Sequence, residues 1–200
     1  MWLQVKSGFT VFLIITVEAI WIAGMSSMLL WKSNIYGRER KRNEQQSDII
    51  AGELIYFPVA RQYIDEIDYQ DTYGADRENG SHTGCDLMDK KNQAGRIPVI
   101  SATNGVVTNL GWLYLGGYRI GITSEKDIYY YYAHLDSYAA NMYVGRTVKA
   151  GELLGFMGNT GEGEEGTKGK FDVHLHFGIY LNRDGKEVTV NPYPYLQNLE

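Results

Sequence analysis

The sequence predicts a mostly β fold, a small antiparallel β sandwich or barrel-like core preceded by one N-terminal transmembrane helix. Three observations lead to this prediction: an almost wholly apolar segment at 8–31, many short strand-like segments bounded by turn residues after it, and an aromatic content dominated by tyrosine. A chain of 200 residues is long enough for one ordinary domain with its own core and a tail. We therefore expect a membrane anchor at 1–32, a linker or juxtamembrane helix at 33–50, and a β domain at 51–200.

The apolar segment contains a single charged residue, Glu18, and is long enough to cross a bilayer as a helix. A cleaved signal peptide is the main alternative. Its apolar core would be shorter, however, and no clean small-x-small cleavage site stands out near residues 22–24. We therefore expect an uncleaved anchor. Glu18 near mid-span is costly unless it is neutral or paired, so it marks either a helix–helix contact or a tolerated protonated carboxyl.

Charge is unevenly distributed along the chain, whose net charge is −5. Residues 1–42 carry six basic and two acidic side chains, which leaves −9 for the remainder. An acidic domain binds the phosphate backbone poorly, so we exclude nucleic acid as a partner. Most of these basic residues follow the apolar segment, and the positive-inside rule taken alone favours a cytoplasmic C-terminal domain. The single cysteine, Cys85, excludes an internal disulfide framework and a multi-cysteine zinc knuckle.

Residues 171–180 alternate strictly between apolar and polar side chains. Because side chains change face at every residue of a strand, this pattern predicts a β-strand with an apolar back and a polar front. The front carries His174 and His176, about 6.5–7 Å apart along the strand. A lone histidine in a strand is usually structural, but two on one face could serve one small site. One could then bind a metal while the other moves a proton.

Further short strands are expected elsewhere in the β domain. Residues 97–102 and 105–112 are expected to pair with each other around a turn at 103–105. In the tyrosine-rich strand at 128–135, alternation places His134 on the same face as Tyr130 and Tyr132. The remaining strands are expected at 54–59, 118–122 and 145–156, and the segments 60–80 and 159–170 are expected to be loops near the site.

His82 and Asp86 lie four residues apart, in a stretch where Gly84 favours a loop that enters a strand. Histidine and aspartate are zinc ligands, and a catalytic zinc needs three protein ligands and an open position for water. His82, Asp86 and one of His174 or His176 would complete that set. Zinc lowers the pKa of its water to about 7. The histidines that are not ligands, with an ordinary pKa of about 6.5, could accept and return the proton.

These residues resemble the motifs of the lysostaphin-type (LytM-like) zinc metalloendopeptidases, which cut peptide bonds in bacterial peptidoglycan. The resemblance covers about residues 54–194, and its matching segments are 82–86, 132–135, 145–151, 155–161 and 174–177. It implies that zinc is held by His82, Asp86 and His176, and that His134 and His174 form the catalytic pair. It also implies a small antiparallel β core with a groove across one sheet, walled here by the segments 60–80 and 159–170.

The chain departs from the family pattern at Cys85, where an aliphatic residue is usual. Because Gly84 and Asp86 flank it, we expect its side chain to point away from the metal and into the core. The tyrosine run at 129–132 is expected to serve mostly strand packing, with one hydroxyl a candidate for the groove. The acidic residues of the second loop are expected to be solvated rather than to touch substrate; they are Glu162, Glu164 and Glu165.

The sequence therefore predicts a membrane-anchored zinc endopeptidase that acts on peptidoglycan peptides, in the stem or in the cross-bridge. The alternative is a non-catalytic module of the same fold that acts as a scaffold or regulator in a cell-envelope complex. Such modules typically lack a ligand, and none is missing here. A cytoplasmic metal-binding protein, favoured only by the flanking charges, would leave the site without substrate. We therefore expect a single-pass protein of the cell membrane with an extracytoplasmic catalytic domain; the sequence specifies no protein partner.

Overall fold

The computed structural model describes residues 5–77 and 80–199, with the side chains of residues 5–20, 22 and 23 outside the description. The chain divides into two units, residues 1–48 and 49–200. The first unit is helical, because α1 (Val5–Glu53) runs through it and ends within the second. The segment 33–50 is therefore a helix, which is one of the two forms expected for it.

The membrane anchor predicted within residues 1–32 falls mainly on residues whose side chains lie outside the description. In the part of the chain that is described, no helix is both long enough and apolar enough to cross a membrane. Anchoring at this segment stays a prediction from the sequence.

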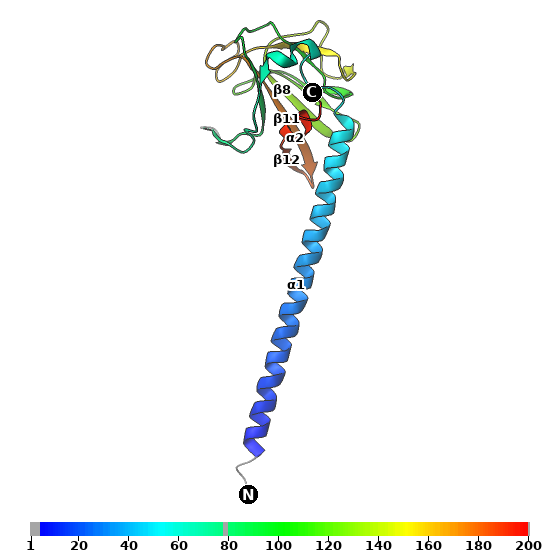
Figure 1. Ribbon diagram of the computed structural model, residues 1–200, viewed down its shortest axis with the longest axis vertical. Coiled ribbons are helices and arrows are strands. Elements are labelled where there is room, and N and C mark those ends of the chain that lie inside the picture. The colour runs from blue at the N-terminus through cyan, green and yellow to red at the C-terminus, as the bar shows by residue number, and fades with distance from the viewer. Residues whose placement is uncertain (1–4, 78–79, 200) are drawn as a thin grey trace. The chain divides into compact units, whose positions relative to one another are not determined.

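The second unit is mostly β and antiparallel, as predicted (Figure 1). Within the described residues, ten strands form one sheet whose main path is β1–β4–β11–β8–β7–β6–β9; β10 joins β5 to β8, and β12 pairs with β11. The bounds are β1 (Ile67–Asp68), β4 (Gly84–Asp89), β5 (Pro98–Ile100), β6 (Gly105–Leu113), β7 (Gly117–Thr123), β8 (Ile128–Tyr138), β9 (Thr147–Val148), β10 (Leu153–Met157), β11 (His174–Arg183) and β12 (Lys186–Val190). Shorter elements are a 3-10 helix (Arg61–Glu66), the ribbon of β2 (Asp76–Arg77) with β3 (Gly80–Ser81), and α2 (Tyr193–Leu196).

The core lies against one face of this sheet. The alternation predicted for residues 171–180 is confirmed from His174 onward, in β11, where Leu175, Phe177 and Ile179 are buried. It is wrong for the first residues, because the strand begins at His174 and Phe171 lines the groove beside His134 and His174 rather than the core. The rings of Tyr130 and Tyr132 pack against Phe177 from the neighbouring strand β8. Apolar residues from the end of α1, the segment after it and α2 complete the core; they include Ile50, Leu54, Phe57 and Leu196. The opposite face is left free for polar side chains.

Two predictions about strand pairing are wrong. Residues 54–59 form no strand and make only a single bridge, from Val59 to Val99. Leu54, Phe57 and Val59 are buried because this segment covers the core, whereas Ile55 and Tyr56 are exposed. The expected hairpin of 97–102 with 105–112 does not form either, because β5 pairs with β10 while β6 pairs with β7 and β9. Alternation along a chain identifies strands but does not determine which neighbour each strand pairs with.

The prediction that His134 shares a face with Tyr130 and Tyr132 is also wrong, because β8 contains a bulge. Tyr118 of β7 pairs with Leu135 and Ile120 pairs with Tyr132, so β8 has one extra residue between these pairs. His134 adopts a left-handed backbone with φ of 62°. An extra residue reverses the facing of the side chains that follow it. His134 therefore points to the polar face, whereas Tyr130 and Tyr132 remain in the core.

Candidate metal centre

The register between β4 and β11 places two predicted site residues opposite each other. His176 pairs with Asp86, and Phe177 pairs with Cys85. Asp86 and His176 therefore share the polar face, while Cys85 is fully buried in the core, as predicted. A Cβ at Gly84 would come within 2.6 Å of His176 Nε2. The absence of a side chain at Gly84 thus leaves room for the imidazole of His176.

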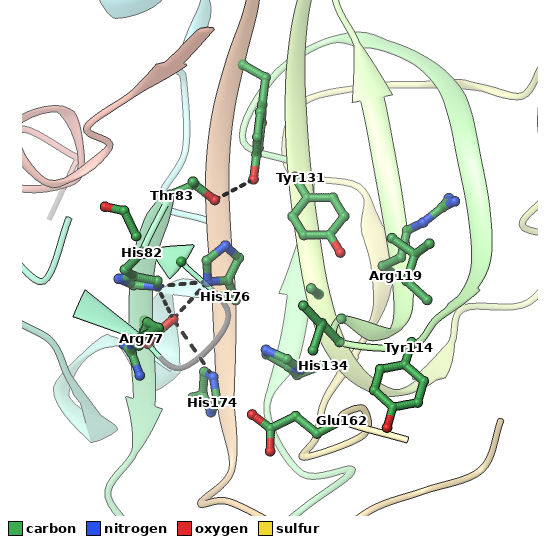
Figure 2. A pocket seen from close by; sticks show the side chains of 18 of the residues that line it. Arg77, His82, Thr83, Tyr114, Arg119, Tyr131, His134, Glu162, His174 and His176 are labelled. Carbon is green, nitrogen blue, oxygen red and sulfur yellow. Dashed lines mark hydrogen bonds and ion pairs between the residues drawn. The ribbon is translucent and has the colours of Figure 1, made fainter. Parts of the chain in front are cut away.

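Three donor atoms converge on this face (Figure 2). His82 Nε2 lies 3.0 Å from Asp86 Oδ1 and 3.0 Å from His176 Nδ1, and the latter two atoms are 2.9 Å apart. The Nδ1 of His82 donates to the carbonyl of Thr72 at 3.0 Å, so Nε2 presents its lone pair to the cluster. A single proton cannot satisfy three acceptors that lie so close together, whereas one cation can.

The charge and geometry of the three residues fit a divalent metal. Burial opposes ionisation of Asp86, but His176 and His82, which donate to its carboxylate when they are protonated, hold the pKa of this carboxyl well below the ordinary value. Tetrahedral zinc with bonds of about 2.0–2.1 Å requires ligand atoms about 3.3 Å apart, close to the separations found here. His174 Nε2 lies 3.8 Å from Asp86 Oδ1, beside the cluster. Of the two strand histidines, His176 is the one within it.

Arg77 contacts the cluster from the side, and the sequence analysis did not identify it. Its guanidinium donates to Asp86 Oδ2 at 2.8 Å, while Oδ1 of the same carboxylate faces the two histidines. Arg77 ends β2, inside the segment 60–80 that was expected only to wall the groove. The only signal for it in the sequence is its closeness to His82.

His134 and His174 form a pair next to the cluster, with ring centroids 4.6 Å apart. Each ring is oriented by its Nδ1, which donates to a backbone carbonyl: Thr160 for His134 and Asp172 for His174, both at 2.8 Å. Phe171 packs against both rings, at centroid distances of 4.7 and 5.1 Å. The Nε2 atom of each histidine is therefore the one that carries a lone pair.

Burial sets the protonation of this pair. It lowers the pKa of His134 to about 3, helped by the neighbouring charges of His174 and His176 when they are protonated. Burial also lowers the pKa of His174, although Asp86 opposes this shift. Both imidazoles are consequently neutral near pH 7. A neutral imidazole whose Nδ1 already donates can accept a proton at Nε2.

The cluster and the histidine pair open into one groove with a volume of about 940 Å³. Both segments expected to wall it contribute lining residues, including Arg77 from the first and Glu162 from the second. A third wall, which the sequence analysis missed, is the turn between β6 and β7. Its exposed apolar side chains also line the groove; they are Leu113, Tyr114 and Leu115.

Tyrosine rings line the groove beyond the histidines. Tyr129 and Tyr131 face the groove, whereas Tyr130 and Tyr132 are buried in the core. The run thus supplies two tyrosines to the groove where the sequence offered one as a candidate. Glycines lie beneath them: a Cβ at Gly121 would come within 2.1 Å of the Tyr129 hydroxyl.

The curated proteins that are similar to this chain include two endopeptidases with extended similarity. The chain is 38% identical over 135 residues to the L-Ala–D-Glu endopeptidase of Bacillus subtilis (strain 168), a match covering 66% of this chain and 40% of that protein. It is 32% identical over 121 residues to lysostaphin of Staphylococcus simulans, covering 60% of this chain and 22% of that protein. The chain therefore spans less than half the length of these relatives.

Solved structures share the fold. A crystal structure of a protein from Ruminococcus gnavus ATCC 29149, described as a glycyl-glycine endopeptidase LytM, is 51% identical with a TM-score of 0.68, covering 73% of this chain and 60% of that one. The catalytic domain of Staphylococcus simulans lysostaphin is 28% identical with a TM-score of 0.55, covering 70% of this chain and 98% of that one. A structure of the SpoIIQ–SpoIIIAH pore-forming complex, 18% identical with a TM-score of 0.53, shares the fold alone and covers 72% of this chain and 90% of that one.

A family model, described as Peptidase family M23, matches residues 80–192. This range covers more than half of the chain and contains all five residues predicted for the site. It also contains the strands β4, β8 and β11, which position them. The chain belongs to Peptidase family M23.

Proposed function

We propose that this protein is a zinc-dependent endopeptidase that hydrolyses peptide bonds in bacterial peptidoglycan. The observation that carries the proposal is the convergence of donor atoms from His82, Asp86 and His176 within 3.0 Å of one another, beside two neutral histidines. The relatives support a peptide bond as the target, since they are named as L-Ala–D-Glu and glycyl-glycine endopeptidases.

In this proposal, zinc is held by His82 through Nε2, His176 through Nδ1 and Asp86 through Oδ1. Zinc in such a site lowers the pKa of a water molecule and polarises the carbonyl of the scissile bond. The carbonyl of Thr72 fixes the orientation of the His82 ring, and Arg77 occupies the second oxygen of Asp86. Partners of this kind, one step removed from the metal, hold ligands in place and raise their basicity.

His134 and His174 handle protons in this scheme. Their Nδ1 protons are committed to the carbonyls of Thr160 and Asp172, so Nε2 accepts the proton that the attacking water loses. The same proton is then returned to the departing amine.

A non-catalytic scaffold of the same fold is the alternative function. Its support is the structural likeness to a protein of the SpoIIQ–SpoIIIAH pore-forming complex, which at 18% identity concerns the fold alone. The present chain keeps three converging donors and two neutral histidines, and a scaffold has no use for them. We therefore favour the hydrolase.

We also propose that residues 1–32 anchor the protein in the cell membrane, with the β domain on the extracytoplasmic side. The support is the apolar sequence of 8–31 together with a site suited to a substrate outside the membrane. The basic residues after this segment oppose this orientation, but large domains translocate largely regardless of such charges.

The full chain, loaded with zinc, is expected to release shorter fragments from purified peptidoglycan peptides, as measured by mass spectrometry. A chelator should abolish the release, and added zinc should restore it.

His174→Ala should retain stoichiometric zinc and lose about 10²- to 10⁴-fold in rate, because it removes a proton carrier. His82→Ala should lose the metal itself. Stoichiometric zinc in the wild type without hydrolysis of any wall peptide would favour the scaffold.

Arg77→Gln is expected to weaken zinc binding by about 10- to 100-fold, because Asp86 loses the partner that holds its second oxygen. Competition with a chromophoric chelator measures this affinity directly. Arg61→Gln is the matched control, since Arg61 is exposed and lies in the 3-10 helix outside the groove lining. Equal affinities in the Arg77 variant and the wild type would contradict this function for Arg77.

The metal-free protein is expected to lose stability between pH 6.5 and about 3 through His134. In this window the unfolded chain binds a proton at this imidazole that the folded chain excludes, so the free energy of unfolding falls as the pH falls. The slope from one such group approaches about 1.4 kcal/mol per pH unit. His134→Asn, whose side chain tolerates the left-handed backbone, should flatten the profile by this amount in urea unfolding. If the free energy of unfolding depends on pH equally in His134→Asn and in the wild type, His134 is not held neutral by burial.

In intact spheroplasts, an external protease is expected to digest the β domain, because the proposed orientation exposes it outside the membrane. Immunoblotting against the C-terminal region measures the digestion, with a known cytoplasmic protein as the control for lysis. Full protection of the β domain while lysed cells show digestion would reverse the orientation.

A further inference from the structure

The groove continues beyond the metal centre to Arg119, and we propose that this arginine recognises a carboxylate of the bound peptide. The inference rests on the proposed function only in taking the ligand to be a peptide. It assigns to Arg119 the selection of substrates that carry a negative charge near the bond to be cut.

The guanidinium of Arg119 is incompletely paired. Its Nε and Nη1 atoms are buried and have no hydrogen-bond partner among the described residues. Within the same residues no ion pair is formed by this side chain. Buried polar groups are ordinarily hydrogen-bonded, and each exception needs a physical reason. Arg119 lines the groove that also contains the five histidine and aspartate residues, so a ligand that displaces the side chains covering Nε and Nη1 would supply the missing acceptors.

Strand register relates Arg119 to the metal centre. His176 of β11 pairs with Ala133 of β8, and the bulge of β8 at Ala133 and His134 lies opposite Arg119 of β7. Arg119 and His176 thus lie in one row across the sheet, two strands or about 10 Å apart at the backbone. Figure 2 shows Arg119 across Tyr131 from His176. An extended peptide advances about 3.3 Å per residue, so a carboxylate within about three residues of the scissile bond reaches Arg119.

The surroundings of Arg119 favour an anion. The groove near it is lined by the neutral side chains of Asn109, Tyr129 and Tyr131, and the amide of Asn109 donates to the Tyr129 hydroxyl at 3.3 Å. Glu187 also lines this groove and acts on the Tyr129 hydroxyl with a charge opposite to that of Arg119, but it forms no ion pair with Arg119 among the described residues. The other arginine in the groove, Arg77, already binds Asp86. A planar guanidinium with free N–H groups matches the two oxygens of a carboxylate.

A carboxylate in such a peptide has two sources: the side chain of an acidic residue, or the free carboxyl terminus. Both present the same planar pair of oxygens to Arg119. The two sources can be distinguished because each carboxylate can be amidated separately in a synthetic peptide. Four peptides of one sequence therefore separate the sources: the diacid, each single amide, and the diamide.

The test measures kcat and KM for these peptides with the zinc-loaded full chain and its variants. In the wild type, amidation of the recognised carboxylate should raise KM, and amidation of the other should have little effect. Arg119→Gln should reduce the preference for the acid over its amide by about 10- to 100-fold, mainly through KM. Arg119→Lys should restore part of it, since it keeps the charge without the planar fork.

Arg146→Gln is the matched control, because Arg146 forms an ion pair with Glu152 and does not line the groove. It should keep the wild-type preference. An acid-to-amide preference that is unchanged in Arg119→Gln, with native zinc content and near-ultraviolet circular dichroism, would overturn the inference.

Calorimetric binding of the same peptides to the zinc-loaded His174→Ala chain, with and without Arg119→Gln, needs no turnover. Carboxylate-dependent binding through Arg119 without hydrolysis by the wild type would support this inference and refute the proposed function. Hydrolysis at a rate that does not depend on either carboxylate would support the proposed function and refute this inference.

Discussion

The site depends on one electrostatic constraint: three electron-pair donors lie within 3.0 Å of one another without enough protons to separate them. Such an arrangement is repulsive unless the fold holds it and a cation neutralises it. The fold holds it through the β4–β11 register, which fixes Asp86 against His176, and through Gly84, which leaves space for the imidazole. The Thr72 carbonyl and the Arg77 guanidinium then orient the remaining atoms.

The bulge in β8 brings His134 to this centre, next to His174 of β11. A regular strand would bury His134 in the core with Tyr130 and Tyr132. One extra residue turns it to the groove, at a backbone φ of 62° that costs roughly 1–2 kcal/mol for a residue with a side chain. Hydrogen bonds from its backbone N–H to Gly116 and from its ring to Thr160 offset this strain. Strain of this kind is concentrated at functional sites.

Local patterns in the sequence predict the features that a single strand determines, and they miss the features that depend on packing between strands. Alternation in residues 171–180 identified β11 and its polar face, because period-two patterning belongs to the strand itself. The facing of His134 was missed because a bulge arises from the fit between two strands. The partners of β5 and β6 were missed for the same reason. Arg119 has no signal in the sequence and Arg77 has only its closeness to His82, since an arginine acquires its function from the groups that the fold places around it.

In the two proposals, the residues that would hold zinc and move protons lie on different strands from the residue that would select the substrate. The donors and the histidine pair come from β4, β8, β11 and the turn before β4, whereas Arg119 lies on β7 and Asn109 on β6. Between them, Tyr129 and Tyr131 rest over Gly121 and Gly116, where any larger residue would displace the rings. Under the two proposals, a change at Arg119 would alter contacts with the peptide and would leave the proposed zinc ligands in place. In a fold built this way, substitutions on β6 and β7 would alter the proposed selection of substrate while the proposed zinc ligands around β4 and β11 are retained, because the two groups of side chains meet only indirectly among the described residues, at Tyr131, whose ring lies 5.9 Å from that of His176.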